Sequence, residues 1–273
     1  MTDQYAVIGN PVAHSKSPLI HAEFARQTGH DLSYVALFAP LDRFEAVVEE
    51  FRSRGGRGAN VTLPFKHRAH ALAAERTPRA EQAGAVNTLS FSTAGVAGDN
   101  TDGVGLVRDI TTNLGFTVRG RRILIMGAGG AAYGACGPLL DEVPAALTIA
   151  NRTMDKARAL RDHLSSVHAR GGMANALGYS ELTGLEFDIV INATSAGLHD
   201  TMPLLPGGVF ATGALAYDMV YDDTPFLEFA RAEGARAVDG LGLLVEQAAE
   251  SYRVWRGVRP QTAALIAQLR AGR

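Results

Sequence analysis

The feature that most limits the fold is a compact apolar run that leads directly into a glycine-rich turn. Residues 121–126 have the composition of a short buried strand, and Gly127-Ala128-Gly129-Gly130-Ala131-Ala132 follows, before a helical pattern. Glycine at 127 allows a tight turn, glycine at 129 lets the backbone approach a pyrophosphate, and alanine at 132 lets the helix pack closely. The N–H groups at the helix start then face phosphate charge. This strand–turn–helix context predicts a dinucleotide-binding unit.

Short β-branched runs alternate with helical patterns along nearly the whole chain, which predicts parallel sheets with crossover helices. Before Asp102, we expect strands at 5–9, 33–38, 60–63, 85–91 and 95–97, and helices at 18–28, at 41–54 and after Pro64. After it, we expect strands at 121–126, 147–150, 188–192, 215–220 and 235–238, and tail helices at 243–256 and 261–270. The change of pattern places a domain boundary near 102–105, and the loop 198–208, with two prolines, is expected to be a mobile flap.

Composition excludes several classes of function. The net charge of −2 gives no basic surplus for nucleic acid, and the single cysteine, Cys136, excludes an intrachain disulfide. Apolar runs are too short to cross a membrane, and residues 1–4 do not resemble a signal peptide. We therefore expect a cytoplasmic α/β protein with a small-molecule substrate, without nucleic-acid or membrane partners; a homodimer stays open.

The residues after the second strand of the nucleotide unit bear on cofactor choice. An acidic residue there would accept a hydrogen bond from the ribose 2′-hydroxyl of NAD. The chain instead has Asn151-Arg152-Thr153, followed by Lys156. Arg152 can hold a 2′-phosphate through charge-assisted hydrogen bonds, where a carboxylate would repel it. The alternative is a solvated helix start with Thr153 as its N-cap, but the position directly after the strand favours NADP(H).

Three polar clusters in the first half of the chain are candidates for substrate binding. Ser15 and Ser17 lie at a predicted helix start and would suit an anion, although Ser17 could serve only as an N-cap. The run 60–66 places Thr62 at a strand end and Lys66 just beyond it, where catalytic groups of open α/β sheets gather. The third cluster, 98–103, includes Asp102 and has Asn87 just upstream. Each has a plain alternative: a solvated lysine, or an acidic residue that caps a helix.

Nine segments together resemble the shikimate dehydrogenase family, in family order and along essentially the whole chain. They are GNPVAHSKSP (9–18), GANVTLPFK (58–66), AGAVNT (83–88), GDNTDG (98–103), GAGGA (127–131), NRT (151–153), INATSAG (191–197), YDMVY (217–221) and DGLGLLVEQAA (239–249). The glycine-rich turn alone is a weak signal, whereas the set is specific.

The resemblance implies two domains with a cleft between them. Residues 1–102 plus 243–273 would form an open α/β substrate-binding (catalytic) domain, and 103–242 a Rossmann-like, doubly wound NADP domain. Lys66 and Asp102 would be the catalytic pair. Ser15 and Ser17 would hold the shikimate carboxylate, and the remaining substrate contacts would be Thr62, Asn87, Asp102, Tyr221 and Gln247. Gly127, Ala128, Gly129, Gly130 and Ala131 would bind pyrophosphate, Asn151, Arg152, Thr153 and Lys156 the 2′-phosphate side, and Met219 and Gly240 the nicotinamide.

The implied activity is the reversible reduction of 3-dehydroshikimate by NADPH, in the biosynthesis of chorismate and aromatic amino acids. Two departures from the family pattern stand out: Ala132-Tyr133 replaces a common Ser-Arg, and Lys156 replaces a common arginine. Two alternatives remain open. One is a quinate/shikimate dehydrogenase with broader substrate and cofactor range, which Asn151-Arg152-Thr153 disfavours. The other is a nucleotide-sensing relative without turnover, which the retained Lys66 and Asp102 disfavour.

Overall fold

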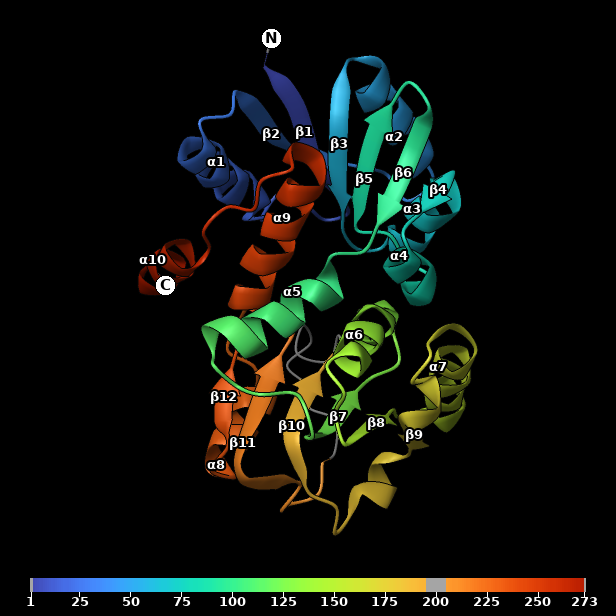
Figure 1. Cartoon of the computed structure of the whole chain (residues 1–273), viewed down its shortest axis with the longest axis vertical. Helices are drawn as coiled ribbons and strands as arrows, with labels where there is room; N and C mark the ends of the chain where they lie inside the picture. The colour runs from blue at the N-terminus through green and yellow to red at the C-terminus, as the bar shows by residue number, and fades with distance from the viewer. Residues whose placement is uncertain (1, 195–204, 273) are drawn as a thin grey trace. The chain divides into compact units, whose positions relative to one another are not determined.

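The computed structural model describes residues 2–194 and 205–272 (Figure 1). It divides into two compact units: unit 1 comprises Met1–Gly105 with Val245–Arg273, and unit 2 comprises Leu106–Leu244. The expected flap at 198–208 lies mostly outside the described residues, as does the end of the INATSAG segment. No helix in the described ranges is long and apolar enough to cross a membrane.

Unit 1 contains a six-stranded sheet in the order β2-β1-β3-β5-β6-β4. Its strands are β1 (Asp3–Gly9), β2 (Leu32–Phe38), β3 (Gly56–Val61), β4 (Glu75–Arg76), β5 (Thr88–Ser92) and β6 (Gly95–Asp99). The expected parallel arrangement has one exception here, because β5 runs antiparallel to both β3 and β6. A tight connection at 93–94 joins β5 to β6, and so short a connection can join only antiparallel strands.

The helices of unit 1 cover both faces of this sheet. They are α1 (Ser17–Thr28), α2 (Phe44–Ser53), α3 (Lys66–Leu72), α4 (Pro78–Ala83), the first part of α5 (Asp102–Arg108), most of α9 (Leu241–Arg256) and α10 (Ala263–Ala271). In Figure 1, α9 crosses the face of β1 and β3. Alternate residues of β1 belong to separate clusters, Ala6 and Ile8 to one and Tyr5 and Val7 to the other, so the strand is buried on both sides.

Unit 2 contains a six-stranded parallel sheet in the order β12-β11-β10-β7-β8-β9. Its strands are β7 (Arg122–Met126), β8 (Ala146–Ala150), β9 (Ala174–Leu177), β10 (Phe187–Asn192), β11 (Phe210–Asp218) and β12 (Arg236–Val238). Its helices are α6 (Gly130–Asp141), α7 (Met154–Val167) and α8 (Pro225–Ala232), with a π-helical turn at Asp109–Asn113 and short 3-10 turns at Gly171–Met173 and Tyr179–Leu182. Read from β9, the strand order is that of the doubly wound dinucleotide fold.

The core of unit 2 also has two layers. Ile123 and Ile125 of β7 pack in one cluster, and Leu124 and Met126 pack in the other. A strand that is apolar on both faces reads as a continuous run, which is why 121–126 was recognisable in the sequence. Cys136 is fully buried in the first of these clusters, as expected for a small apolar residue on the helix after the turn.

Candidate functional site

The polar clusters of unit 1 gather at one edge of its sheet. In this sheet β2 lies on one side of β1, and β3 lies on the other side. The strand order therefore reverses between β1 and β3, and such a topological switch point is the usual ligand position in open α/β sheets. Ser15 and Ser17 follow β1, and Thr62 and Lys66 follow β3. Because β5 is antiparallel, its beginning lies at this same edge, where Thr88 pairs with Asn60 on one side and Asp99 on the other.

Lys66 and Asp102 form an ion pair at this edge. The Lys66 Nζ atom lies 2.7 Å from Asp102 Oδ2, and the two side chains are 24% and 14% exposed. The other carboxylate oxygen, Oδ1, accepts a hydrogen bond of 2.8 Å from Asn87 Nδ2. Asn87 also lies 3.4 Å from Gln247 Oε1, which α9 supplies. The structure thus brings together four residues that the sequence placed at separate positions: Lys66, Asn87, Asp102 and Gln247.

A buried hydrogen-bond network fixes the orientation of Asn87. Its Oδ1 atom accepts from the backbone N–H of Thr101 at 2.8 Å, which forces its Nδ2 atom toward Asp102. Behind it, Ser251 contacts the hydroxyls of Thr88 and Thr101 at 2.8 and 3.1 Å. The sequence placed Thr101 in the polar cluster 98–103 without its hydrogen-bond role, and it gave no signal for Ser251, because an isolated hydroxyl residue does not indicate its partners.

The two serines lie at the start of α1. The alternative in which Ser17 serves only as an N-cap is wrong: the N-cap is Lys16, and Ser17 is the first helical residue. Ser15 Oγ accepts a hydrogen bond from the Ser17 N–H at 3.2 Å. Ser17 is only 6% exposed. Burial raises the pKa of Tyr34 well above its usual value, and the interaction with Ser17 offsets this only in part. Thr62 is half-buried between the ends of β1 and β3, with its N–H bonded to the carbonyl of Ile8.

The glycine-rich turn of unit 2 has the geometry that a pyrophosphate requires. Gly127 has φ of 101°, which favours glycine, and an added Cβ atom would lie 3.0 Å from Thr194 Cγ2. Gly129 is the N-cap of α6, so no side chain caps this twelve-residue helix. The first N–H groups of α6 therefore have no capping partner within the helix, and they suit an anion. Ala128, Gly130 and Ala131 complete the turn.

The positively charged segment after β8 is open to solvent. Arg152, Thr153 and Lys156 are exposed, and Asn151 donates from Nδ2 to the carbonyl of Thr153 at 2.8 Å. Thr153 is the N-cap of α7, but its side chain makes no capping hydrogen bond. The alternative interpretation, in which the Thr153 hydroxyl serves only to cap the helix, requires a hydrogen bond that the side chain does not make. The ring of Tyr133, one of the departures from the family pattern, packs 5.2 Å from that of His163 on α7.

The residues expected near the nicotinamide meet at the ends of β11 and β12. Gly240 donates its N–H to the carbonyl of Val220 at 2.9 Å, and an added Cβ atom would lie 2.4 Å from the carbonyl oxygen of Met219. Only glycine permits that approach. Tyr221 follows in the same turn and is 36% exposed. Within the described ranges, no group of three or more His, Cys, Asp or Glu side chains could hold a metal ion.

Comparison with known families gives three matches that follow the chain in order. Residues 7–89 match the shikimate dehydrogenase substrate binding domain, and residues 109–199 match the family described as shikimate / quinate 5-dehydrogenase. Residues 240–270 match the shikimate 5′-dehydrogenase C-terminal domain.

Individual relatives are similar over almost their full length. A protein of Nitrosospira multiformis named shikimate dehydrogenase (NADP(+)) is 58% identical, with 99% of this chain and 98% of the relative covered. One of the same name from Methylobacillus flagellatus is 58% identical over 98% and 99%. Among solved structures, shikimate 5-dehydrogenase of Thermus thermophilus in complex with NADP(H) and shikimate has a TM-score of 0.86 at 32% identity, covering 99% of each chain.

Proposed function

The chain belongs to the shikimate dehydrogenase family, and from this premise we propose how its residues carry out the reaction. Its activity is the reversible, NADP-dependent reduction of 3-dehydroshikimate to shikimate in the shikimate pathway. The observation that carries the residue assignment is the Lys66–Asp102 pair, 2.7 Å apart beside Asn87 at the switch-point edge of unit 1.

Substrate binds to unit 1 through its carboxylate and its hydroxyls. Ser15 and Ser17 bind the carboxylate, since both lie at the start of α1, where no side chain caps the helix and the helix dipole favours an anion. The other side chains that we assign to substrate binding are Thr62, Asn87, Asp102, Gln247 and Tyr221. Asn87 and Asp102 hold each other through one hydrogen bond, so a substrate hydroxyl meets a donor and an acceptor whose positions are already fixed.

Lys66 supplies the proton that the reduction requires. As the carbonyl at C3 becomes an alkoxide, negative charge develops on oxygen, and an ammonium group in a partly buried site stabilises it and donates to it. Asp102 orients the Lys66 Nζ atom through the 2.7 Å contact. In the oxidative direction, Lys66 accepts the proton of the C3 hydroxyl at the same atom.

Unit 2 fits an NADP cofactor. When bound, NADPH supplies the hydride. The turn Gly127–Ala131 would hold the pyrophosphate at the uncapped start of α6, and Asn151, Arg152, Thr153 and Lys156 would hold the 2′-phosphate. The three residues directly after β8, Asn151-Arg152-Thr153, include no carboxylate that would repel that phosphate. Met219 and Gly240 would line the nicotinamide. We accordingly assign substrate binding to 1–102 with 243–273, and NADP binding to 103–242.

The cofactor assignment is tested with one set of steady-state measurements. We expect the wild-type protein to oxidise shikimate with NADP at least tenfold more efficiently than with NAD, since one or two charge-assisted bonds contribute about 1.5–3 kcal/mol each. Arg152→Ala should lower kcat/KM for NADP by roughly ten- to a hundredfold and leave NAD turnover nearly unchanged.

The matched control is Arg158→Ala. Arg158 is also an exposed arginine, but it lies on α7 and pairs with Asp155, and we assign it no contact with the cofactor. A wild type that prefers NAD, or an Arg152→Ala enzyme that loses both cofactors equally, would contradict the 2′-phosphate assignment. Quinate, assayed beside shikimate with each cofactor, separates this enzyme from a quinate/shikimate dehydrogenase of broader range.

We also propose that the enzyme works in the cytoplasm as a homodimer. The only cysteine is buried and unpaired, which suits a reducing compartment. Within the described residues, the edge strand β2 pairs with β1 alone and exposes Val35 and Phe38 (39% and 60%), which a second copy would cover. Sedimentation of the wild type and Phe38→Glu tests the dimer: a wild-type monomer would contradict it.

A further inference from the structure

A buried carboxylate in unit 2 has no role in the chemistry described above. Asp218 ends β11 and is 0% exposed. Its Oδ2 atom accepts hydrogen bonds from Asn192 Nδ2 at 2.9 Å and from the Thr224 hydroxyl at 2.7 Å. Its Oδ1 atom accepts from the backbone N–H of Val220 at 2.9 Å. Asn192 and Thr224 are themselves buried, at 1% and 2% exposure.

This carboxylate is held only by neutral donors. Its three hydrogen-bond partners are an amide, a hydroxyl and a backbone N–H, and no salt bridge to it occurs in the described ranges. Burial raises the pKa of Asp218, and the nearby charge of Asp239 adds to the rise. A buried charge without a cationic partner is costly, and sequences retain such groups mainly where they do something that a neutral group could not.

The hydrogen bonds of Asp218 hold both ends of the turn 219–223. Asp218 precedes the turn 219–223, and Thr224, which follows it, begins α8 by accepting from the N–H of Leu227. Asp218 therefore ties the start of α8 to the end of β11 and also fixes the N–H of Val220. The backbone of Met219 is held separately, by its N–H to the carbonyl of Asn192 at 3.0 Å and by the close approach of Gly240.

Asn192 connects the same turn to the glycine-rich turn. Its Oδ1 atom accepts from the N–H and the hydroxyl of Thr194, at 3.1 and 2.7 Å. The amide orientation is therefore fixed, with Nδ2 toward Asp218. The Thr194 methyl lies where a Cβ atom on Gly127 would meet it at 3.0 Å. One chain of side chains thus runs from the pyrophosphate turn to the turn that carries Met219.

We propose that Asp218 is a positioning residue for the nicotinamide: with Asn192 and Thr224, it fixes the backbone of Met219 and Val220 so that the ring is held for hydride transfer. This inference rests on the proposed function, because it takes Met219 and Gly240 as the nicotinamide lining. Asp218 acts through the turn and does not itself touch the substrate or the ring.

The hydrogen-bond pattern makes the role of the carboxylate sharply testable. All three neighbours donate, so an Asp218→Asn amide must direct its NH₂ group at a donor, either at Val220 or at Asn192. Exchanging the two residues, in Asn192→Asp/Asp218→Asn, restores the pairs with residue 192 and with Val220: the new amide donates to the new carboxylate and accepts from Val220. The Thr224 hydroxyl, which donates in the wild type, then accepts from the amide instead. The carboxylate at 192 still accepts from Thr194. The double exchange should therefore recover what the single change loses.

The experiment compares hydride transfer with the binding of two ligands. Single-turnover oxidation of shikimate gives the rate, and titration gives the affinities for NADPH and for adenosine 2′,5′-bisphosphate, which lacks the nicotinamide. We expect Asp218→Asn to slow hydride transfer by roughly ten- to a hundredfold, because small misplacements of reacting atoms have effects of that size. Its affinity for adenosine 2′,5′-bisphosphate should stay within about twofold, and the double exchange should restore most of the rate.

Asp188→Asn is the matched control, since Asp188 lies on the neighbouring strand β10 and pairs with Arg122. An Asp218→Asn protein with wild-type rate, or with equal loss of both ligands, would overturn the inference, as would a folded double exchange that recovers nothing. If Asp218→Asn does not fold, two variants of Thr224 are compared instead. Thr224→Val loses the hydroxyl that donates to Asp218, whereas Thr224→Ser keeps it, so only the first should slow hydride transfer. Equal rates for these two variants would overturn the inference. A wild type without shikimate turnover would instead refute the proposed function.

Discussion

Lys66 and Asp102 show how a single residue position acquires a chemical role. Lys66 is the first residue of α3, and Asp102 the first residue of α5, so each lies just beyond a strand of the same sheet. Asn87 donates a hydrogen bond from Nδ2 to Oδ1 of Asp102, and this bond holds the other carboxylate oxygen toward Lys66. The sequence predicted both residues from their place after strands and from their motifs. It could not predict the hydroxyl network of Thr101 and Ser251, because those partners are 150 residues apart.

The Lys66 assignment predicts a specific kinetic change. Lys66→Ala should lower kcat by roughly 10²–10⁴-fold, the usual contribution of a positioned acid–base group. The KM for shikimate should change much less, because the ammonium acts mainly on charge that develops in the transition state. Steady-state kinetics, with thermal unfolding to confirm an intact fold, makes the test. Near-normal kcat in a folded Lys66→Ala protein would remove Lys66 from the mechanism.

His21 predicts a dependence of stability on pH. It is buried in α1 and its ring stacks on Tyr34, 4.1 Å between ring centres. Burial lowers the pKa of His21 from 6.5 to about 3, and a hydrogen bond with Asn60 offsets this only in part. Below pH 6.5 the unfolded chain binds a proton that the folded protein does not, so the free energy of unfolding falls as the pH falls toward 3.

The expected size is about 2 kcal/mol lost between pH 8 and pH 5, from one linked proton. Urea unfolding at several pH values should show this slope in the wild type and a flatter one in His21→Phe. The control is His67→Phe, which changes an exposed histidine of α3. Parallel slopes in the wild type and His21→Phe would show that this histidine is not the linked group.

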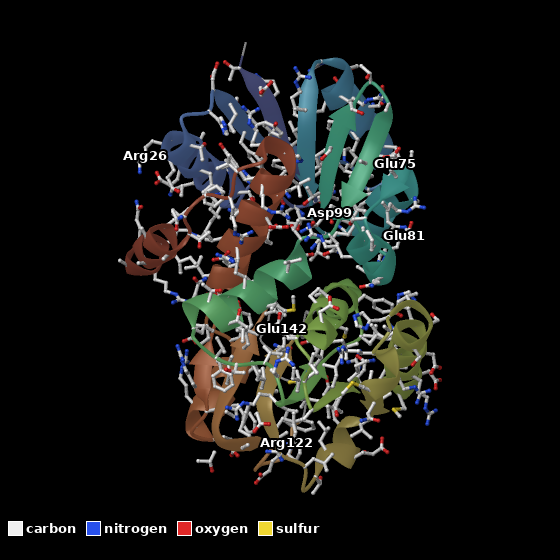
Figure 2. All side chains as sticks on the ribbon, viewed as in Figure 1. Arg26, Glu75, Glu81, Asp99, Arg122 and Glu142 are labelled. Carbon is white, nitrogen blue, oxygen red and sulfur yellow. The ribbon has the colours of Figure 1, made fainter. Side chains whose placement is uncertain are left out.

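At the scale of elements, α9 is joined to other parts of unit 1 by a group of largely buried ion pairs. Glu250, with a side chain only 5% exposed, meets Arg79 at 3.0 Å and Arg253 and Arg259 at 2.6 Å each. Arg79 also pairs with Asp99 at the end of β6, labelled in Figure 2. Burial opposes the charge of Glu250, yet hydrogen bonds from Arg253 and Arg79 lower its pKa to about 2. One carboxylate therefore joins α4, α9 and the segment that leads to α10.

Removing this charge should destabilise unit 1. Glu250→Gln leaves three arginines around a neutral amide, and breaking a buried pair from one side usually costs about 3–5 kcal/mol. Because the pKa of Glu250 is lowered from 4.5 to about 2, its contribution is complete above pH 4.5 and is lost as the pH falls toward 2. Urea unfolding at pH 7 and pH 3 should therefore show a difference from wild type that shrinks in acid.

Glu49→Gln, which removes an exposed pair with Arg52, should change stability by less than about 1 kcal/mol. Similar losses for Glu49→Gln and Glu250→Gln would contradict the special position of Glu250.

The elements differ in how well the sequence predicted them. The apolar runs of β7, β8 and β10 were predicted to within one residue at each end, because strands buried on both faces are continuous in the sequence. The antiparallel direction of β5 was missed, since strand direction depends on its partners and not on its own composition. β4, with two residues, and β9, with four, were also missed, because edge strands this short carry no period.

At the scale of the whole molecule, each unit has its own sheet, core and switch point. The division between the units falls inside α5 and inside α9. A helix interior has no change of composition, so the sequence could indicate a boundary region but no single residue. What made the two-domain interpretation accessible was the set of motifs, several of which lie at strand ends.

The two-unit arrangement predicts that each ligand protects its own unit. At a hundred times its Kd, adenosine 2′,5′-bisphosphate should raise the opening free energy of slowly exchanging amides in β7 and β8 by about 2.7 kcal/mol. Amides of β1 and β3 should change little, and shikimate should produce the reverse pattern. Hydrogen exchange read by mass spectrometry distinguishes these outcomes. Equal protection of both sheets by either ligand would mean that the molecule opens only as a whole.

The division of unit 1 into two segments has a consequence for synthesis on the ribosome. Asn60, Thr88 and Thr101 need the hydroxyl of Ser251, which is 191 residues beyond Asn60 in the chain. When those three leave the exit tunnel, their partner has not been translated. Unit 2 is one continuous segment and can fold as soon as it emerges. The N-terminal part of unit 1 is therefore synthesised first but completes its fold last. Until Ser251 has been made, the polar side chains of Asn60, Thr88 and Thr101 must hydrogen-bond to water in its place.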